Sequence, residues 1–280
     1  MKNEGLNGFR SMLQEEEKSG VTIEKYLRDV KQFLLWQGER ELDKGLVIAW
    51  KQSLLERGYR VRSINSMLAS VNAWLRYLER MDCRVRNLRL QHQVYCPPER
   101  ELKRTEYERL LKCAEKEPRL YVLMQTIVAT GIRISELNYF TVEAVEQGEI
   151  IVRCKGKSRP IMLSGKLRKL LLAYAKKNQI ATGLIFRTRN GKPLDRSNIW
   201  SEMKKLCQDA GIEPTKVFPH NLRKLFARIF YKTYKDLANL ADILGHSSLN
   251  TTRIYIMTSG EEHRRQLEAV NLIYDYANFG

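Results

Sequence analysis

The segment ATGIRISEL, from Ala129 to Leu137, lies between two helical patterns in the second half of the sequence. Gly131 can end the first helix, because glycine adopts the left-handed conformation that closes many helices. Arg133 and Glu136 are three residues apart and would share a helix face, so the carboxylate could hold the guanidinium in place. An ordinary surface ion pair would have the same spacing, and this segment by itself favours that simpler interpretation.

The segment PHNLR, residues 219–223, is a second candidate. Proline suits the first turn of a helix, and His220 and Arg223 would then lie on one face. Donor groups at a helix N-terminus form an anion site, because the unpaired backbone N–H groups point the same way. A capping histidine beside a solvated arginine explains the segment equally well.

The segment LGHSSLNTTRIY, residues 244–255, places His246 nine residues before Tyr255. Ser247, Ser248 or Asn250 could cap a helix that ends by presenting this tyrosine. The sequence contains 13 tyrosines, so a half-buried aromatic is the simpler interpretation of any single one.

Two short runs, residues 149–153 and 159–163, alternate or are rich in β-branched residues, which predicts a hairpin. The connection between them contains Lys155 and Lys157. A lysine at such a tip is usually only solvated. It becomes interesting as a mobile cation that can reach a phosphate held by other groups.

Together these segments resemble the tyrosine recombinase (phage integrase) family. The family's pattern is an Arg in a TGxRxSEL segment, a Lys in a β-turn, an HxLR segment, an LGH segment and a Tyr nine residues later. This chain has these elements in the same order over about 125 residues. It departs from many members at Lys224, where they have a second histidine; that position is thought to be structural.

The resemblance implies a 3′-phosphotyrosyl intermediate formed by Tyr255, with Lys155 as the general acid for the 5′-oxygen. Arg133, Arg223, His220 and His246 would be the remaining catalytic residues, and Glu136 would support them. Such donors can stabilise the phosphorane charge that Mg²⁺ stabilises in many nucleases, so we expect neither a metal nor another cofactor. No ATP is expected either, because the bond energy stays in the intermediate. The sequence does not separate acid, base and electrostatic roles for the two histidines.

The expected fold is mainly α-helical with a small β-sheet. Residues 1–92 would form an N-terminal helical bundle that resembles the family's SAM-like core-binding domain. Residues 93–102, with Pro97 and Pro98, would be a linker, and residues 103–280 a mixed α/β catalytic domain. This layout is similar to that of Xer recombinases.

Periodicity supplies the approximate bounds. The N-terminal domain should hold a helix around 9–17, one after a Thr22 cap, one after an Asp43 cap, and one over 63–81. The catalytic domain should be helical over 105–116, 119–130, 132–139, 165–178 and 196–210, with a third strand at 184–187. In the tail, residues 256–280, a helix is expected over 261–274. Periodicity leaves open whether it packs on its own domain, and the resemblance favours docking on a neighbouring protomer.

The formal net charge of +17 indicates a polyanionic partner. We expect duplex DNA, bound by a homotetramer that is monomeric when free, with accessory proteins left open. Candidate DNA-binding residues are Arg84, Arg86, Arg89, Lys157 and Arg159. The five cysteines form no CxxC pair, and no apolar run approaches the length of about 20 residues that a membrane span needs, so we expect a cytoplasmic protein.

Three other functions remain open at this stage. A type IB-like topoisomerase could use the same groups. A catalytically silent DNA-binding regulator could share the fold, although every expected catalytic residue is present. An RNA-binding protein would show aromatic residues arranged for base stacking, and no such cluster is visible. The sequence does not indicate the DNA target, or whether the reaction is integration, dimer resolution or inversion.

Overall fold

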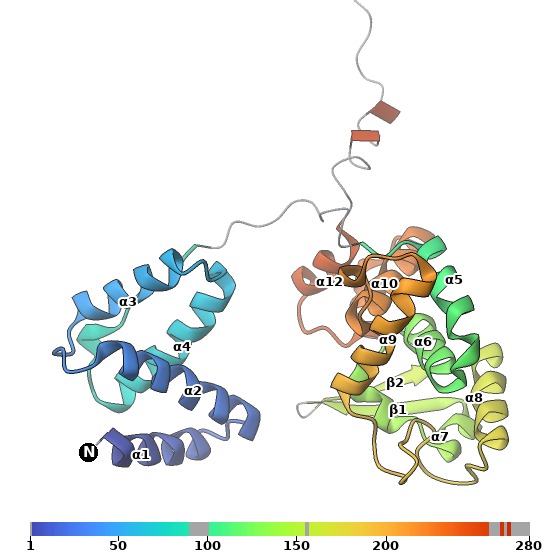
Figure 1. The fold of residues 1–280 in the computed structure, drawn as a ribbon, viewed down its shortest axis with the longest axis horizontal. Coiled ribbons are helices and arrows are strands. Elements are labelled where there is room, and N and C mark those ends of the chain that lie inside the picture. Colours follow the sequence, from blue (N-terminus) through green and yellow to red (C-terminus); the bar gives the residue numbers. More distant parts are fainter. Residues whose placement is uncertain (1, 90–100, 155–156, 258–263, 266–267, 270–280) are drawn as a thin grey trace, which may run out of the picture. The chain divides into compact units, whose positions relative to one another are not determined.

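The structure, a computed structural model, describes residues 2–89, 101–154, 157–257, 264–265 and 268–269. The chain divides into two compact units, residues 1–92 and 93–280, and each has its own hydrophobic core (Figure 1). The observed fold is mainly helical with one small sheet, as predicted.

The described part of the N-terminal unit contains α1 (Lys2–Glu15), α2 (Gly20–Gln37), α3 (Lys44–Glu56), α4 (Val61–Tyr77) and a short 3₁₀ helix, η1 (Met81–Cys83). Buried aromatic residues join these helices. Phe33 of α2 meets Trp50 of α3 edge to face at 5.1 Å, and Phe9 of α1 meets Trp74 of α4 at 5.3 Å. Edge-to-face contacts of this kind stabilise a core beyond the area that they bury.

The predicted cap of α3 is confirmed, because the Asp43 carboxylate accepts a hydrogen bond from the Leu46 N–H at 2.6 Å. The predicted cap of α2 is wrong. Ser19 caps this helix and accepts from the N–H of Thr22, which lies inside the first turn. Both residues can cap, and periodicity does not choose between candidates three residues apart.

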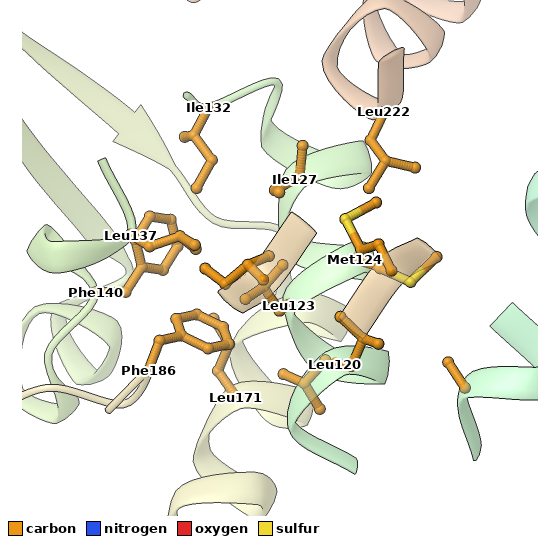
Figure 2. Close-up of a cluster of buried hydrophobic side chains, with 14 of the residues drawn as sticks. Leu120, Leu123, Met124, Ile127, Ile132, Leu137, Phe140, Leu171, Phe186 and Leu222 are labelled. Atoms are coloured by element: carbon orange, nitrogen blue, oxygen red, sulfur yellow. The ribbon is translucent and has the colours of Figure 1, made fainter. Parts of the chain in front are cut away.

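The second unit contains α5 (Arg104–Cys113), η3 (Ala114–Lys116), α6 (Pro118–Thr130), η4 (Ile134–Tyr139), α7 (Val142–Gln147), β1 (Glu149–Cys154), β2 (Lys157–Met162), α8 (Gly165–Lys177), α9 (Arg196–Ala210), η5 (Pro214–Lys216), α10 (Pro219–Tyr234), α11 (Leu237–Leu244) and α12 (Leu249–Ile256). Helix α6 is central and packs against α8, α9 and α10. Its side chains Leu120, Leu123, Met124 and Ile127 point into the shared core, and Leu222 of α10 faces them (Figure 2).

Strands β1 and β2 pair antiparallel from Glu149↔Met162 to Cys154↔Lys157. The predicted third strand over 184–187 is not formed; Leu184 and Arg187 make only isolated bridges, to Thr141 and Pro193. The predicted helix over 132–139 is a 3₁₀ helix that starts at Ile134.

Candidate active site

Helix α6 ends at Gly131, whose φ of +65° is left-handed. A Cβ at this position would lie 2.4 Å from the Phe226 ring and 2.9 Å from Leu244. Glycine therefore satisfies both the backbone conformation and the close packing of α10 and α11. The sharp turn directs the chain into Arg133, which occupies the N-cap position of η4.

Glu136 holds Arg133 from two sides. One carboxylate oxygen accepts from the Arg133 backbone N–H at 2.8 Å, and the other accepts from Nη1 at 3.0 Å. Arg133 Nη2 donates to the carbonyl of Gly245 at 3.2 Å. The Glu136 side chain is only 4% exposed, whereas that of Arg133 is 36% exposed. The pair is therefore not an ordinary surface pair, because a buried carboxylate fixes a guanidinium that still reaches solvent.

Helix α10 begins at Pro219 and places His220 and Arg223 on its first turns. Arg223 is 1% exposed. Its Nη1 donates to the carbonyl of Gly131, and its Nη2 donates to that of Leu244 at 2.6 Å. Its buried Nε has no hydrogen-bond partner within the part of the chain that the structure describes. Burial and the nearby Arg133 lower the pKa of Arg223 to about 10, so it stays charged near neutral pH.

The loop between α11 and α12 carries His246, and its hydrogen bonds define the tautomer. Arg223 Nη2 lies 3.0 Å from His246 Nε2, and an arginine can only donate, so Nε2 must accept. The proton of the neutral ring is then on Nδ1, which lies 2.9 Å from the hydroxyl oxygen of the buried Thr252. Thr252 therefore accepts from His246 and orients its ring.

Tyr255 lies on α12 and is 8% exposed. Its ring centroid is 5.0 Å from that of His220 and 4.8 Å from that of His246, both edge to face. The Arg223 guanidinium lies 5.7 Å from the Tyr255 centroid. One tyrosine out of 13 is thus surrounded by the two histidines and the arginine that the sequence selected.

Both histidines are neutral at physiological pH. Burial is the main cause, and it lowers the pKa of each to about 4. Neighbouring cations also lower both pKa values. Lys224 and then Arg223 make the largest charge contributions at His220, and Arg223 makes the largest at His246. The positive charge of the site is therefore carried by arginines, while the histidines supply neutral hydrogen-bonding groups.

The other candidates fall in different places. Lys155 and the side chain of Lys157 lie outside the described residues. Arg84, Arg86 and Arg89 are exposed in the N-terminal unit. Arg159, which is also a candidate DNA contact, has a side chain only 15% exposed, and this side chain pairs with Glu136 at 2.6 Å.

Sequence reasoning overlooked two contributors. Thr252 is one of several hydroxyl residues in its segment, and only the packing of α12 shows that it faces His246. Gly245 has a φ of +62°, and a Cβ there would lie 2.6 Å from Arg159 Nε. The LGH pattern included Gly245, but the arginine that packs against it is 86 residues earlier in the chain.

Two further observations complete the description. No helix in the described ranges is long and apolar enough to cross a membrane. Among the same residues, no group of three or more His, Cys, Asp or Glu side chains could hold a metal ion.

Comparison with known families gives a consistent result. Residues 100–262 match the phage integrase family, and residues 6–82 match the phage integrase N-terminal SAM-like domain. The chain belongs to the phage integrase family, and the enzyme class predicted from the sequence, a tyrosine site-specific recombinase, is confirmed.

Xer recombinases are among the relatives. The chain is 31% identical to tyrosine recombinase XerA of Thermococcus kodakarensis, over 97% of this chain and 96% of the relative. It is 30% identical to tyrosine recombinase XerD of Pseudomonas aeruginosa, over 84% and 85% of the two chains.

Solved structures show the same fold. A crystal structure of XerA recombinase matches with a TM-score of 0.55 at 25% identity, over 98% of this chain and all of that one. A lambda integrase (75–356) dimer bound to a COC′ core site matches with a TM-score of 0.73 at 16% identity, over 99% of each chain. At that identity the second likeness concerns the fold alone.

Proposed function

We propose that this recombinase cleaves and rejoins duplex DNA through a covalent bond between Tyr255 and a 3′-phosphate. The observation that best supports this proposal is that Tyr255 lies beside Arg223, His220 and His246. After burial, the charge of Arg133 is the next cause that lowers the pKa of Arg223. The two guanidinium groups therefore repel each other, and a bound anion would relieve this repulsion. A phosphate oxygen could also accept from the Nε of Arg223, which has no hydrogen-bond partner among the described residues.

In the proposed reaction the Tyr255 oxygen attacks phosphorus, and the bond to the 5′-oxygen breaks. Arg133 and Arg223 stabilise charge on the non-bridging oxygens. Lys155 protonates the departing 5′-oxygen, a role implied by the family. Rejoining reverses these steps: the 5′-hydroxyl attacks phosphorus and displaces the tyrosine. No metal or ATP is needed, so cleavage should continue in excess EDTA.

The geometry favours His220 as the acceptor of the Tyr255 proton. His246 Nε2 already accepts from Arg223, and its Nδ1 proton is directed to Thr252. His246 would have to lose a hydrogen bond to Arg223 before it could take a proton. His220 is neutral and its ring is in contact with that of Tyr255.

We infer that the protein acts as a tetramer on two DNA sites. One of the solved relatives is a lambda integrase tetramer bound to a Holliday junction, and another is XerH recombinase bound to difH DNA. The recombinase names of the relatives favour this activity over a topoisomerase that works alone and over a silent regulator.

Substitution Tyr255→Phe tests the proposal. It removes only the hydroxyl group, so folding and DNA binding should persist while covalent protein–DNA complexes disappear. Tyr234→Phe is the comparison, because Tyr234 is an exposed tyrosine of α10 and a candidate nucleophile; its covalent complexes should persist if Tyr255 is the nucleophile. A covalent complex that survives in Tyr255→Phe would mean that another residue, with Tyr231 and Tyr234 the next candidates, is the nucleophile.

A further inference from the structure

Arg159 is a partly buried cation that the proposed reaction does not use. It lies on β2, opposite Val152 of β1 and four residues after Lys155. An arginine near a hairpin tip is usually solvated, yet this side chain is only 15% exposed. The burial of a charge is costly unless it is paired and hydrogen-bonded, so its partners indicate its role.

Those partners come from two other segments of the catalytic unit. Nη2 donates to Glu136 Oε2 at 2.6 Å, and this oxygen also accepts the backbone N–H of Arg133 at 2.8 Å. Nη1 donates to the carbonyl of Ile243, at the end of α11, at 2.6 Å.

The stem of the side chain makes a third contact, with Gly245. A Cβ on Gly245 would lie 2.7 Å from Arg159 Cδ, so the absence of a side chain there allows the arginine to pass. The carbonyl of Gly245 also accepts from Arg133 Nη2, and His246 follows next in the chain.

We propose that Arg159 is a positioning residue, which joins the hairpin that carries Lys155 to the segments that carry Arg133 and His246. The inference rests on the proposed function, because it assigns Arg159 to the geometry of that reaction and not to DNA contact. A planar guanidinium can donate to Glu136 and Ile243 together, in a fixed fork. A lysine has a single nitrogen and cannot reproduce this bridge.

The test compares Arg159→Gln and Arg159→Lys with Arg153→Gln. Arg153 is the matched control, because it is exposed on the same hairpin, and its loss removes one positive charge without touching the bridge. Each protein is mixed with an excess of half-site DNA that traps the covalent complex, so each protein molecule reacts once. Affinity, single-turnover rate constant and burst amplitude are measured separately.

With Arg159→Gln, we expect half-site affinity and burst amplitude to match the control. The rate constant at saturating DNA should fall about 10- to 100-fold, the loss typical of reacting groups that are displaced by about 1 Å. Arg159→Lys should restore little of the rate. A loss of affinity with an unchanged saturated rate would overturn the proposal and make Arg159 a DNA contact, and a smaller amplitude at an unchanged rate would show only a stability defect.

A second variant covers the case in which Arg159→Gln does not fold. Glu136→Gln removes the buried charge that Arg159 neutralises, so the double variant carries no unpaired carboxylate. The double variant is compared with Glu136→Gln alone. If Arg159 acts through Glu136, adding Arg159→Gln to Glu136→Gln should lower the rate constant little further. A further loss of about 10-fold or more would contradict the proposal. If no variant, including Arg153→Gln and the unaltered chain, formed a covalent complex, the proposed function itself would have failed.

Discussion

At the scale of single residues, the site divides charge and hydrogen bonding between different side chains. Arg223 is a buried cation held by carbonyl oxygens, and it forces His246 to be a neutral acceptor at Nε2. That assignment gives Thr252 a role, because its hydroxyl oxygen accepts from His246 Nδ1. A hydroxyl group buried behind a histidine is a means of fixing both its tautomer and its ring orientation.

Thr252→Val should therefore slow cleavage while preserving the shape of the core. Loss of one hydrogen bond is worth about 1 kcal/mol, which corresponds to about a fivefold lower rate constant. Single-turnover cleavage at saturating DNA measures it. Thr251→Val, at an exposed neighbouring position on α12, is the control and should change nothing. Equal rates in the two variants would mean that Thr252 does not orient His246.

The two site histidines should also make stability depend on pH. Their pKa values are about 4 in the folded protein, and the ordinary value is 6.5. Between these values the unfolded chain binds more protons than the folded one, so stability is lost as pH falls from about 6.5 to 4. The free energy of unfolding, measured with urea on the DNA-free protein, should fall over this pH range. The fall should be smaller in a His220→Gln, His246→Gln double variant, and an equal fall would contradict the burial of neutral histidines.

At the scale of secondary structure elements, short connections bring the site together. Helix α6 leads through Gly131 directly into Arg133, and α10 packs on α6 so that Arg223 reaches the carbonyl of Gly131. The hairpin register pairs Cys154 with Lys157. Lys155, the general acid that the family resemblance implies, comes directly after Cys154 in the sequence and lies outside the described residues.

A chemical substitution in the DNA tests that role. Lys155→Ala should be severely slow on ordinary DNA, because the 5′-oxygen leaves without a proton. A 5′-bridging phosphorothiolate has a thiolate leaving group that needs no proton, so cleavage of that substrate should largely recover. Lys157→Ala is tested on the same two substrates, and the sulfur substrate should give it no recovery if Lys155 is the general acid. If the rate of Lys155→Ala did not recover on the sulfur substrate, Lys155 would not be the general acid, and Lys157 or a histidine would be the next candidate.

At the scale of the whole molecule, the questions concern assembly. The segment after α12 follows Tyr255 closely, so a tail that docked on a neighbouring protomer would couple the position of the nucleophile to assembly. The expected final helix, residues 261–274, is short, and its apolar residues need a surface to cover them. Most of that segment lies outside the described residues, and its docking remains a prediction.

Deletion of residues 261–280 should leave a folded protein that binds one half-site normally but no longer assembles cooperatively on a full site. Gel-shift titrations on half and full sites measure both properties, and circular dichroism checks the fold. Unchanged cooperativity in a folded truncation would mean that the tail packs on its own domain or takes no part in assembly.

The sequence alone determined the fold class, because helical periodicity, one alternating pair of runs and the order of short motifs are local features. It also selected the residues that the structure brings together around Tyr255. Local signals were less reliable where two residues could do the same task, as with Ser19 and Thr22 at the start of α2.

Only the tertiary structure decided what each basic residue does. Arg153 and Arg159 lie on the same hairpin, yet Arg153 is exposed, whereas Arg159 is only 15% exposed and packs against Glu136 and Gly245. The tautomer of His246 likewise follows from Arg223 and Thr252, which reach it from two other helices. The physical reason is that burial and hydrogen-bond partners depend on which segments pack together, and residues distant in the chain supply them.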